Sequence, residues 1–269
     1  MVSFIVTNYN KEKTILITLS SIINVINLED ELLFIDDGST DNSLMLVENY
    51  LKEKISNYRV VKLKNGGVSN ARNQGLSNAT KKWIFHIDGD DFIIKNEFLK
   101  IRDNIHNYNS DVIICDFLFN NEAFHKKKLI NNNFFLFSLS KCYNLGILPR
   151  IGSVFIKRKK SPMFNNKVNL YEDLLFFDSL IGLKSTFCNK TILSYESNSN
   201  SLSIYDRKRL FDNYREILNA RISSGLILYL FSLLSKKEII VLMFRFPKLL
   251  YLRIILKHLI KKNIKICCQ

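Results

Sequence analysis

Short runs of β-branched and aromatic residues alternate with longer stretches of helical periodicity over the first 117 residues of the chain. This alternation predicts a sheet with parallel strands, because parallel neighbours need a crossover connection that is usually a helix. The apolar runs are nearly continuous, as expected for strands that are covered on both faces. We predict strands over 2–7, 32–36, 59–63, 83–87 and 111–117, and helices over 11–25, 41–55, 68–79 and 95–107.

The regular pattern stops at residues 120–133, which are polar and basic and include Lys126, Lys127 and Lys128. This segment is either an exposed insertion near the acceptor side of a site or a plain solvated loop. Further along the chain we predict a strand over 152–157, a helix over 172–183 and a strand over 191–195. Long helices are possible after Asp206, because the chain has only three prolines.

The net charge of +14 is concentrated near the end of the chain. Residues 1–105 hold 13 basic and 14 acidic residues, whereas residues 236–269 hold nine basic residues and one acidic residue. A nucleic-acid-binding protein usually shows a recognisable module or aromatics on a basic face, and neither is found. We therefore expect no nucleic-acid partner and expect an anionic membrane surface instead.

Five scattered cysteines show neither a disulfide framework nor the spacing of a zinc site, which suits a reducing cytosol. The first residues lack the features of a secretory signal, and no apolar run is long enough to cross a membrane. We expect a cytoplasmic protein, peripheral on the inner face of the plasma membrane.

Three carboxylates, Asp88, Asp90 and Asp91, directly follow the predicted strand 83–87. They repel one another unless a cation lies among them, and carboxylate oxygens are the ligands that Mg²⁺ and Mn²⁺ prefer. Phosphate oxygens of a nucleotide would then fill the remaining positions around the metal. The alternative is a plain turn, because Asp and Gly both suit turn conformations.

Polar residues also follow the first two strands, at 8–10 and 36–41, so that three polar clusters should meet at one edge of the sheet, where such folds bind ligands. Asp37 could accept a hydrogen bond from a nucleobase, with Thr7 and Tyr9 adding polar and stacking contacts. The alternative for 36–41 is a simple joint between strand and helix, with Asp41 or Ser43 as the N-cap.

Two further segments carry candidate residues. The segment 66–75 has the spacing of neither a dinucleotide-binding fingerprint nor a P-loop, yet Arg72 and Asn73 could reach a nucleotide; alternatively, they pack a helix that Ser69 caps. Glu172 and Asp173 open an apolar helix, where they either stabilise the helix dipole or provide a general base.

Five motifs in this order resemble the family-2 inverting glycosyltransferases with a GT-A fold. The motifs, which fall within residues 1–203, are VTNYNKE (6–12), LFIDDGSTD (33–41), GGVSNARNQGL (66–76), WIFHIDGDD (83–91) and YEDLLFF (171–177). The resemblance implies a GT-A-like mixed, mainly parallel α/β sheet covered by helices. It also implies sugar transfer with inversion from a nucleotide-diphosphate donor.

The resemblance assigns roles only to the matching positions. Thr7, Tyr9, Asp37 and Asp88 would bind the nucleotide, and Asp90 with Asp88 would bind Mn²⁺ or Mg²⁺. Asp91 would orient the donor sugar, Glu172 would touch the acceptor, and Asp173 would be the catalytic base.

Family habit suggests a UDP-sugar, transfer of a hexose or N-acetylhexosamine, and a glycan or lipid-linked glycan acceptor of bacterial surface polysaccharide such as lipopolysaccharide or capsule. The chain departs from many relatives at 195–203, which has no Arg or Lys. Arg207, Lys208 or Arg209 would have to neutralise the pyrophosphate instead.

We predict two parts, a GT-A domain over 1–203 and a helical basic C-terminal extension over 204–269. Within the extension, residues 248–265 show a basic stripe and an aliphatic stripe, which suits either the plane of an anionic membrane or packing on the protein's own core. The basic stripe holds Arg253, Lys257, Lys261 and Lys265, and the aliphatic stripe holds Leu249, Leu252, Leu256 and Leu259.

Two alternative functions remain. A nucleotidyltransferase of related fold would usually carry a Gly-rich, basic loop after the first strand, which residues 7–13 lack. A non-enzymatic membrane-binding protein with a degenerate cleft would not need both Asp90 and Asp173.

Overall fold

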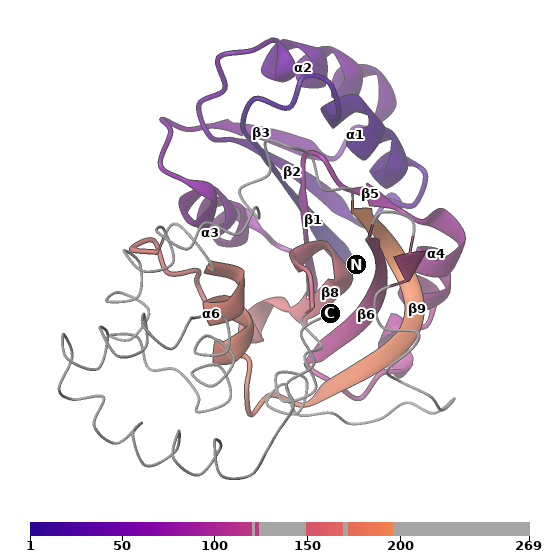
Figure 1. The fold of residues 1–269 in the computed structure, drawn as a ribbon. Helices are drawn as coiled ribbons and strands as arrows, with labels where there is room; N and C mark the ends of the chain where they lie inside the picture. The colour runs from indigo at the N-terminus through magenta and orange to yellow at the C-terminus, as the bar shows by residue number, and fades with distance from the viewer. Residues whose placement is uncertain (120–121, 124–148, 169–171, 196–269) are drawn as a thin grey trace, which may run out of the picture. The chain divides into compact units, whose positions relative to one another are not determined.

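The computed structural model describes residues 1–119, 122–123, 149–168 and 172–195 (Figure 1). The predicted extension over 204–269, its amphipathic segment 248–265 and the basic residues Arg207, Lys208 and Arg209 all lie outside the described residues, as does nearly all of the predicted insertion 120–133. The boundary between residues 203 and 204 therefore stays a prediction.

The described part of the chain alternates strands and helices as predicted. The strands are β1 (Val2–Asn8), β2 (Glu31–Asp36), β3 (Tyr58–Lys62), β4 (Trp83–Asp88), β5 (Phe92–Ile93), β6 (Val112–Phe119), β7 (Glu122–Ala123), β8 (Val154–Lys157) and β9 (Ser185–Tyr195). The α-helices are α1 (Ile15–Ile23), α2 (Ser43–Lys54), α3 (Val68–Asn78), α4 (Lys95–Asp103) and α6 (Glu172–Ser179), and the 3-10 turns are η1 (Ile105–Asn107), η2 (Ile151–Ser153) and η3 (Arg158–Lys160). None of these helices combines the length and the apolar character that crossing a membrane requires.

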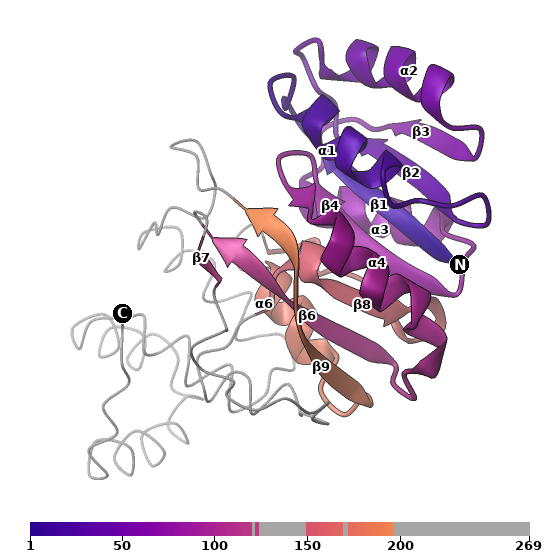
Figure 2. The ribbon, with the colours of Figure 1, turned by 90° about the vertical axis from the view of Figure 1, so that its right-hand side faces the viewer.

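The strands form one mixed sheet in the order β3-β2-β1-β4-β8-β6-β9-β5, with β7 beside β6. β3, β2, β1 and β4 are parallel, and β8 runs antiparallel to both of its neighbours, β4 and β6. Figure 2 shows β6 and β9 side by side, where they pair in parallel over most of their length. The predicted mixed α/β architecture is confirmed.

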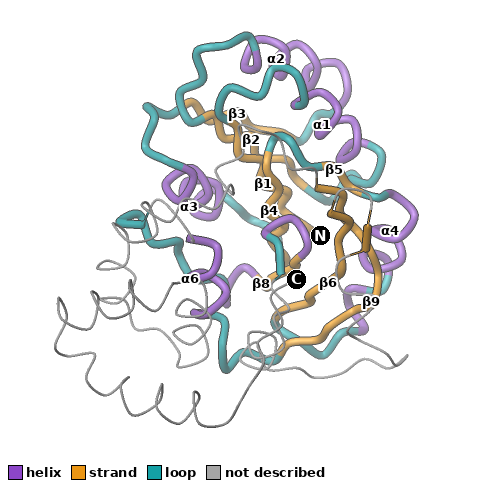
Figure 3. Tube along the Cα trace, viewed as in Figure 1, coloured by secondary structure: helices purple, strands orange, loops and turns teal. Residues whose placement is uncertain are grey.

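Alternate residues of the central strands face opposite layers of helices, because side chains of a strand point to its two faces in turn. Phe4 and Val6 of β1 pack in one core with α1, α2 and α4, whereas Ile5 packs in a second core with Ala71 and Leu76 of α3. His86 of β4 contacts Phe176 of α6, which places α6 on the same face as α3. Figure 3 shows the strands between these two groups of helices.

Several elements differ from the sequence prediction, among them α4, which ends at Asp103 rather than 107, and β8, which begins at Val154 rather than 152. β9 begins at Ser185 rather than 191, because its first half is polar and gave no strand pattern. The two-residue strand β5 is too short to show any periodicity. α1 begins at Ile15 rather than 11, since Asn10 is in the left-handed conformation (φ 53°) and bends the chain there. α6 ends at Ser179 rather than 183, shortly before Gly182 turns the chain with φ 95°.

Gly75 of α3 allows the helix to lie directly on β1. A Cβ at this position would lie 2.2 Å from Cγ2 of Ile5, which is far inside van der Waals contact. We predict that Gly75→Ala lowers the free energy of unfolding by about 1–3 kcal/mol despite the better helix propensity of alanine. Urea unfolding measures the change, and Ser77→Ala, at an exposed position of the same helix, is the matched control that should be neutral or slightly stabilising. Equal midpoints for the two variants would contradict the close approach.

Candidate active site

The carboxyl ends of β1, β2 and β4 bring the three polar clusters to one edge of the sheet, as predicted. In the strand register Asn8 lies opposite Asp36, and Thr7 lies opposite Asp88. Thr7 donates a hydrogen bond from its hydroxyl to Asp88 Oδ1 at 2.7 Å. The first Asp of the acidic motif is therefore held in place by the neighbouring strand.

The loops that follow β1 and β2 are joined by side-chain hydrogen bonds. The Asn8 amide donates to Asp36 and to Ser43, each at 2.9 Å, and the Asn10 carbonyl oxygen accepts from the Thr40 amide at 2.7 Å. Asp41 accepts from the Ser43 amide at 3.0 Å, but the N-cap of α2 is Asn42, so neither of the two predicted cap residues holds that position. These bonds fix the edge of the site.

Asp37 is buried and accepts hydrogen bonds from the loop that precedes α3. Its two carboxylate oxygens accept from the amides of Gly66 and Gly67 at 2.9 and 2.8 Å. These bonds support the interpretation of residues 36–41 as a joint between strand and helix. Each carboxylate oxygen of Asp37 nevertheless keeps one lone pair for a further donor. Tyr9, at the end of β1, is 45% exposed, so its ring is open to a stacking partner. Base contacts by Asp37 and Tyr9 stay predictions.

Arg72 of α3 joins two motifs that lie far apart in the sequence. Its guanidinium is buried and donates to both oxygens of Asp88, at 3.0 and 2.9 Å, and to Glu172 Oε1 at 3.1 Å, across 100 residues of chain. These contacts use every lone pair of Asp88 except one on Oδ2, which leaves one position for a cation.

Asn73, the neighbour of Arg72, fixes the segment that carries Phe164. Its side chain accepts from the Phe164 amide at 2.7 Å and donates to the Phe164 carbonyl at 3.0 Å. Phe164 then lies 5.2 Å from the Arg72 guanidinium. The helix is capped by Gly67 rather than by Ser69, which is buried without a hydrogen bond to its hydroxyl. These contacts do not test whether Arg72 or Asn73 also reaches a nucleotide.

The charges of this cluster depend on one another. Burial would lower the pKa of Arg72, but Asp88, Glu172 and Asp173 outweigh it and raise that pKa further, so the guanidinium stays charged. Burial would raise the pKa of Asp88, but Arg72 and Thr7 outweigh it and lower that pKa. Burial and the charge of Asp173 raise the pKa of Glu172, and Arg72 offsets this only in part.

Asp90 and Asp91 lie in different surroundings. Asp90 forms an ion pair with Lys11 from the loop after β1. Asp91 is 6% exposed, and its Oδ1 has no hydrogen-bond partner among the described residues. Burial, Asp88 and Asp90 all raise the pKa of Asp91 well above its usual range.

These carboxylates fit a divalent cation that takes most of its ligands from a phosphate group and from water. The described residues contain no group of three or more His, Cys, Asp or Glu side chains placed to hold a metal. However, Asp90 already holds a cationic group, and Asp91 offers an unpartnered carboxylate oxygen. One or two carboxylates, completed by phosphate oxygens and water, are a usual set for Mg²⁺.

Glu172 and Asp173 begin α6, as predicted. Asp173 Oδ1 accepts from the amide of Leu174 at 2.8 Å, and its charge raises the pKa values of both Arg72 and Glu172. The bonds of Arg72 bring this end of α6 to Asp88. The structure thus gathers the predicted catalytic residue and the acidic motif in one cluster.

The sequence did not single out two residues of this site, Lys11 and Arg150. Lys11 follows β1 at the edge where the polar clusters meet, and this position was the one available signal. The Arg150 guanidinium lies 4.1 Å from the ring centre of Tyr195 and opposes the rise in the pKa of Asp91. No local pattern around Arg150 pointed to the site, because its partners are distant in sequence.

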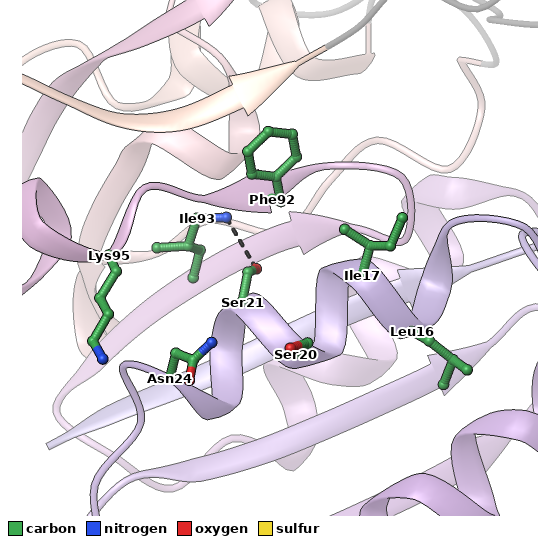
Figure 4. Close-up of a pocket in the computed structure, with 8 residues that line it drawn as sticks. All are labelled: Leu16, Ile17, Ser20, Ser21, Asn24, Phe92, Ile93 and Lys95. Atoms are coloured by element: carbon green, nitrogen blue, oxygen red, sulfur yellow. Dashed lines mark hydrogen bonds between the residues drawn. The ribbon is translucent and has the colours of Figure 1, made fainter.

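A hollow of about 430 Å³ lies elsewhere, between α1 and β5. Figure 4 shows its lining, which includes the hydrogen bond from the Ile93 amide to the Ser21 hydroxyl at 3.0 Å. None of the predicted site residues lines it. It lies beside α1, whereas the charged cluster involves α3 and α6 on the other face of the sheet, so we do not assign it to the donor.

Residues 3–162 match the family model described as "Glycosyl transferase family 2", which is more than half of the chain. The chain belongs to glycosyl transferase family 2. This confirms the family that the five motifs indicated, and the chain is a glycosyltransferase with a GT-A fold. No curated protein matches this glycosyltransferase.

Solved structures of S. aureus TarS share the fold. Residues 1–349 of TarS in complex with UDP-GlcNAc match with 23% identity and a TM-score of 0.66, covering 83% of this chain and 68% of that one. The same TarS fragment in another crystal structure matches with 24% identity and a TM-score of 0.62, over 83% and 67% of the two chains. A longer TarS structure also matches with 22% identity, and the match covers 41% of that longer TarS chain.

Removing the Arg72 charge should leave two partly buried carboxylates, Asp88 (35% exposed) and Glu172 (15% exposed), without their partner. We predict that Arg72→Met lowers the free energy of unfolding by about 2–3 kcal/mol, which is less than the roughly 3–5 kcal/mol of a fully buried ion pair because solvent partly screens the two carboxylates. Chemical denaturation measures the loss. Lys62→Met is the matched control, because Lys62 pairs with Glu48 at 2.8 Å on the surface and its loss should cost under about 1 kcal/mol. Similar losses in both variants would show that the buried cluster is not held by Arg72.

His86 of β4 is buried against Phe164 and Phe176, with ring centroids 5.4 and 6.2 Å away. Neither ring nitrogen has a hydrogen-bond partner among the described residues. Burial and the charge of Arg72 lower the pKa of His86 from 6.5 to about 3, with Asp88 opposing. Between these values the unfolded chain binds a proton that the folded protein does not, so folding stability falls as the pH falls.

We therefore predict that His86→Phe makes the glycosyltransferase less sensitive to acid. Between pH 6.5 and 3 the wild type should lose stability more steeply than the variant, by at most roughly 1.4 kcal/mol per pH unit. Urea unfolding at a series of pH values measures the two slopes. His106→Phe replaces an exposed histidine and should keep the wild-type slope. Parallel slopes for wild type and His86→Phe would show that His86 is protonated in the folded protein.

Proposed function

We propose that the enzyme transfers a hexose or N-acetylhexosamine, with inversion, from a nucleoside-diphosphate donor to a hydroxyl group of a glycan or lipid-linked glycan. The observation that carries this proposal is the position of Arg72, which bonds both Asp88 of the acidic motif and Glu172 beside Asp173. A carboxylate able to take a proton thus belongs to the same cluster as the carboxylates expected to meet the donor. The complex of TarS with UDP-GlcNAc supports a UDP-sugar as the donor.

Asp173 acts as the general base in this proposal. The acceptor oxygen attacks the anomeric carbon as Asp173 removes its proton, and the bond to the diphosphate breaks with its electron pair leaving on the diphosphate. Such assistance typically contributes about 10²- to 10⁴-fold to the rate. Asp173 is partly exposed, so an acceptor hydroxyl can reach it. The charge of Arg72 keeps this end of α6 in place during the reaction.

Asp90 and Asp88 would hold Mn²⁺ or Mg²⁺. The cluster contains five carboxylates, Asp88, Asp90, Asp91, Glu172 and Asp173, and its two directly paired cations are Arg72 and Lys11. This excess of negative charge would repel a diphosphate in the absence of a further cation. A bound metal would supply Lewis-acid stabilisation of the charge on the leaving diphosphate.

The remaining predicted residues surround this centre. Thr7, Tyr9 and Asp37 would contact the nucleotide, and Asp91 would orient the donor sugar. Glu172, whose pKa is raised by burial and by the charge of Asp173, would touch the acceptor. Attachment to the inner membrane face through 204–269, and a role in lipopolysaccharide or capsule synthesis, belong to the same proposal.

We predict that Asp173→Asn lowers the rate of sugar transfer by at least about a hundredfold while donor affinity changes less than about threefold, because the amide cannot accept the proton. Transfer is measured with UDP-GlcNAc and a glycan acceptor, and donor affinity is measured by calorimetry with Mn²⁺ present. Asp103→Asn is the matched control, since this carboxylate is 60% exposed at the end of α4. Near-normal turnover of Asp173→Asn would reject Asp173 as the base.

A further inference from the structure

The Lys11 side chain reaches the acidic motif from a backbone position that hydrogen bonds hold in place. Its carbonyl oxygen accepts from the amides of Thr14 and Ile15, at 3.0 and 2.9 Å, and the Thr14 hydroxyl donates to the carbonyl of Gly89 at 3.0 Å. The loop after β1 is thereby attached to the turn that carries Asp90. The Lys11 ammonium reaches Asp90 Oδ2 from this anchored base.

The ion pair lies at the border of the solvent. The Lys11 side chain is 34% exposed and that of Asp90 is 20% exposed, whereas Arg72 on the neighbouring Asp88 is 4% exposed. Solvent screens a partly exposed pair and so reduces its contribution to stability, and a lysine side chain is a flexible stem with a compact charge. Lys11 can therefore leave its carboxylate at small cost, whereas Arg72 cannot.

We propose that Lys11 is an exchangeable counter-ion of Asp90, which neutralises this carboxylate when the donor site is empty and gives way when a divalent cation binds. This inference rests on the proposed function, since it concerns the same acidic motif. A second observation points to a cation: Asp91 Oδ1, in the same turn, is buried and has no hydrogen-bond partner among the described residues, Lys11 included. The single charge of Lys11 thus leaves the cluster incompletely neutralised.

The exchange follows from electrostatics. An ammonium and a divalent ion on the same carboxylate repel each other, so each lowers the affinity of the other. After exchange, the anchored Lys11 remains beside the site with its charge free to meet an anion. A diphosphate group is the anion that the proposed donor would bring there. Lys11 is thus a positioning residue that opposes metal binding in the empty enzyme and favours the donor in the loaded one.

Removal of the Lys11 charge should strengthen metal binding in the empty enzyme and weaken donor binding in the metal-loaded enzyme. One variant can therefore test both effects. In the donor-free protein, Lys11→Met should bind Mn²⁺ at least about threefold more tightly than the wild type, because a nearby positive charge is removed. The Mn²⁺ affinity is measured from the free-ion electron paramagnetic resonance signal. In the presence of saturating Mn²⁺, the same variant should bind UDP at least about threefold more weakly, as measured by calorimetry.

Lys13→Met is the matched control, because Lys13 is an exposed lysine of the same loop and should change either affinity less than about twofold. Lys11→Arg retains the charge, so it should keep Mn²⁺ affinity near the wild-type value even if Lys11→Met unfolds. An Mn²⁺ affinity of Lys11→Met that equals or falls below that of Lys13→Met would overturn the exchange. Binding of Mn²⁺ by Lys11→Met alone, with none by wild type, would support it.

Absence of Mn²⁺ binding in every variant would overturn the exchange together with the metal site of the proposed function. The base role of Asp173 is measured separately, by the transfer rate of Asp173→Asn, and can stand or fall without it. Failure of the Lys11 inference is therefore distinguishable from failure of the proposed sugar transfer.

Discussion

The buried guanidinium of Arg72 is the contact on which the geometry of the active site depends. It connects α3, the end of β4 and the start of α6 through one side chain. Removing a guanidinium and two carboxylates from water costs several kcal/mol per ion, and their mutual attraction offsets this only when geometry and hydrogen bonding are good. Such a cluster is weak evidence for stability. Its value lies in fixing where Glu172 and Asp173 stand relative to Asp88.

The cations of this cluster are graded from the interior to the solvent, because Arg72 is 4% exposed and Lys11 is 34% exposed. Asp88 is fixed and ionised beside the buried arginine, Asp91 is buried with a raised pKa, and Asp90 meets a partly exposed lysine. The innermost pair is therefore permanent, whereas the outermost pair can change partners. This gradient suits an enzyme whose substrate brings both negative charge and a metal ion, because the protein alone leaves the cluster with excess carboxylates.

The sequence predicted the arrangement of strand ends because strand periodicity and parallel connectivity are local properties. Runs such as 2–7 and 83–87 are nearly all apolar, and polar residues follow them at once, so the shared edge could be inferred without coordinates. The family resemblance then supplied roles for Asp90 and Asp173. The contact of Arg72 with Glu172 could not be inferred, because it spans 100 residues and depends on how α6 packs.

Other features escaped prediction for similar reasons. Asn10 adopts a left-handed conformation that shortens α1, and its short polar side chain supports this conformation by accepting a hydrogen bond from the amide of Thr40. The first half of β9 is polar and becomes a strand by pairing with β6. In each case a distant partner decides the local conformation, so a window of sequence does not contain the deciding information.

The two faces of the sheet are stabilised in different ways, and this difference bears on catalysis. The face under α1, α2 and α4 is a continuous apolar core with several packed aromatic rings, such as Phe4, Phe85 and Phe98. The face under α3 and α6 combines a smaller apolar cluster with the ion pair of the buried Arg72 and with His86, whose ring nitrogens have no hydrogen-bond partner among the described residues. Polar groups that lack partners in the interior reduce stability, yet they are the groups a substrate can use. The apolar face can therefore supply most of the folding stability, which leaves the other face free to carry charges placed for chemistry.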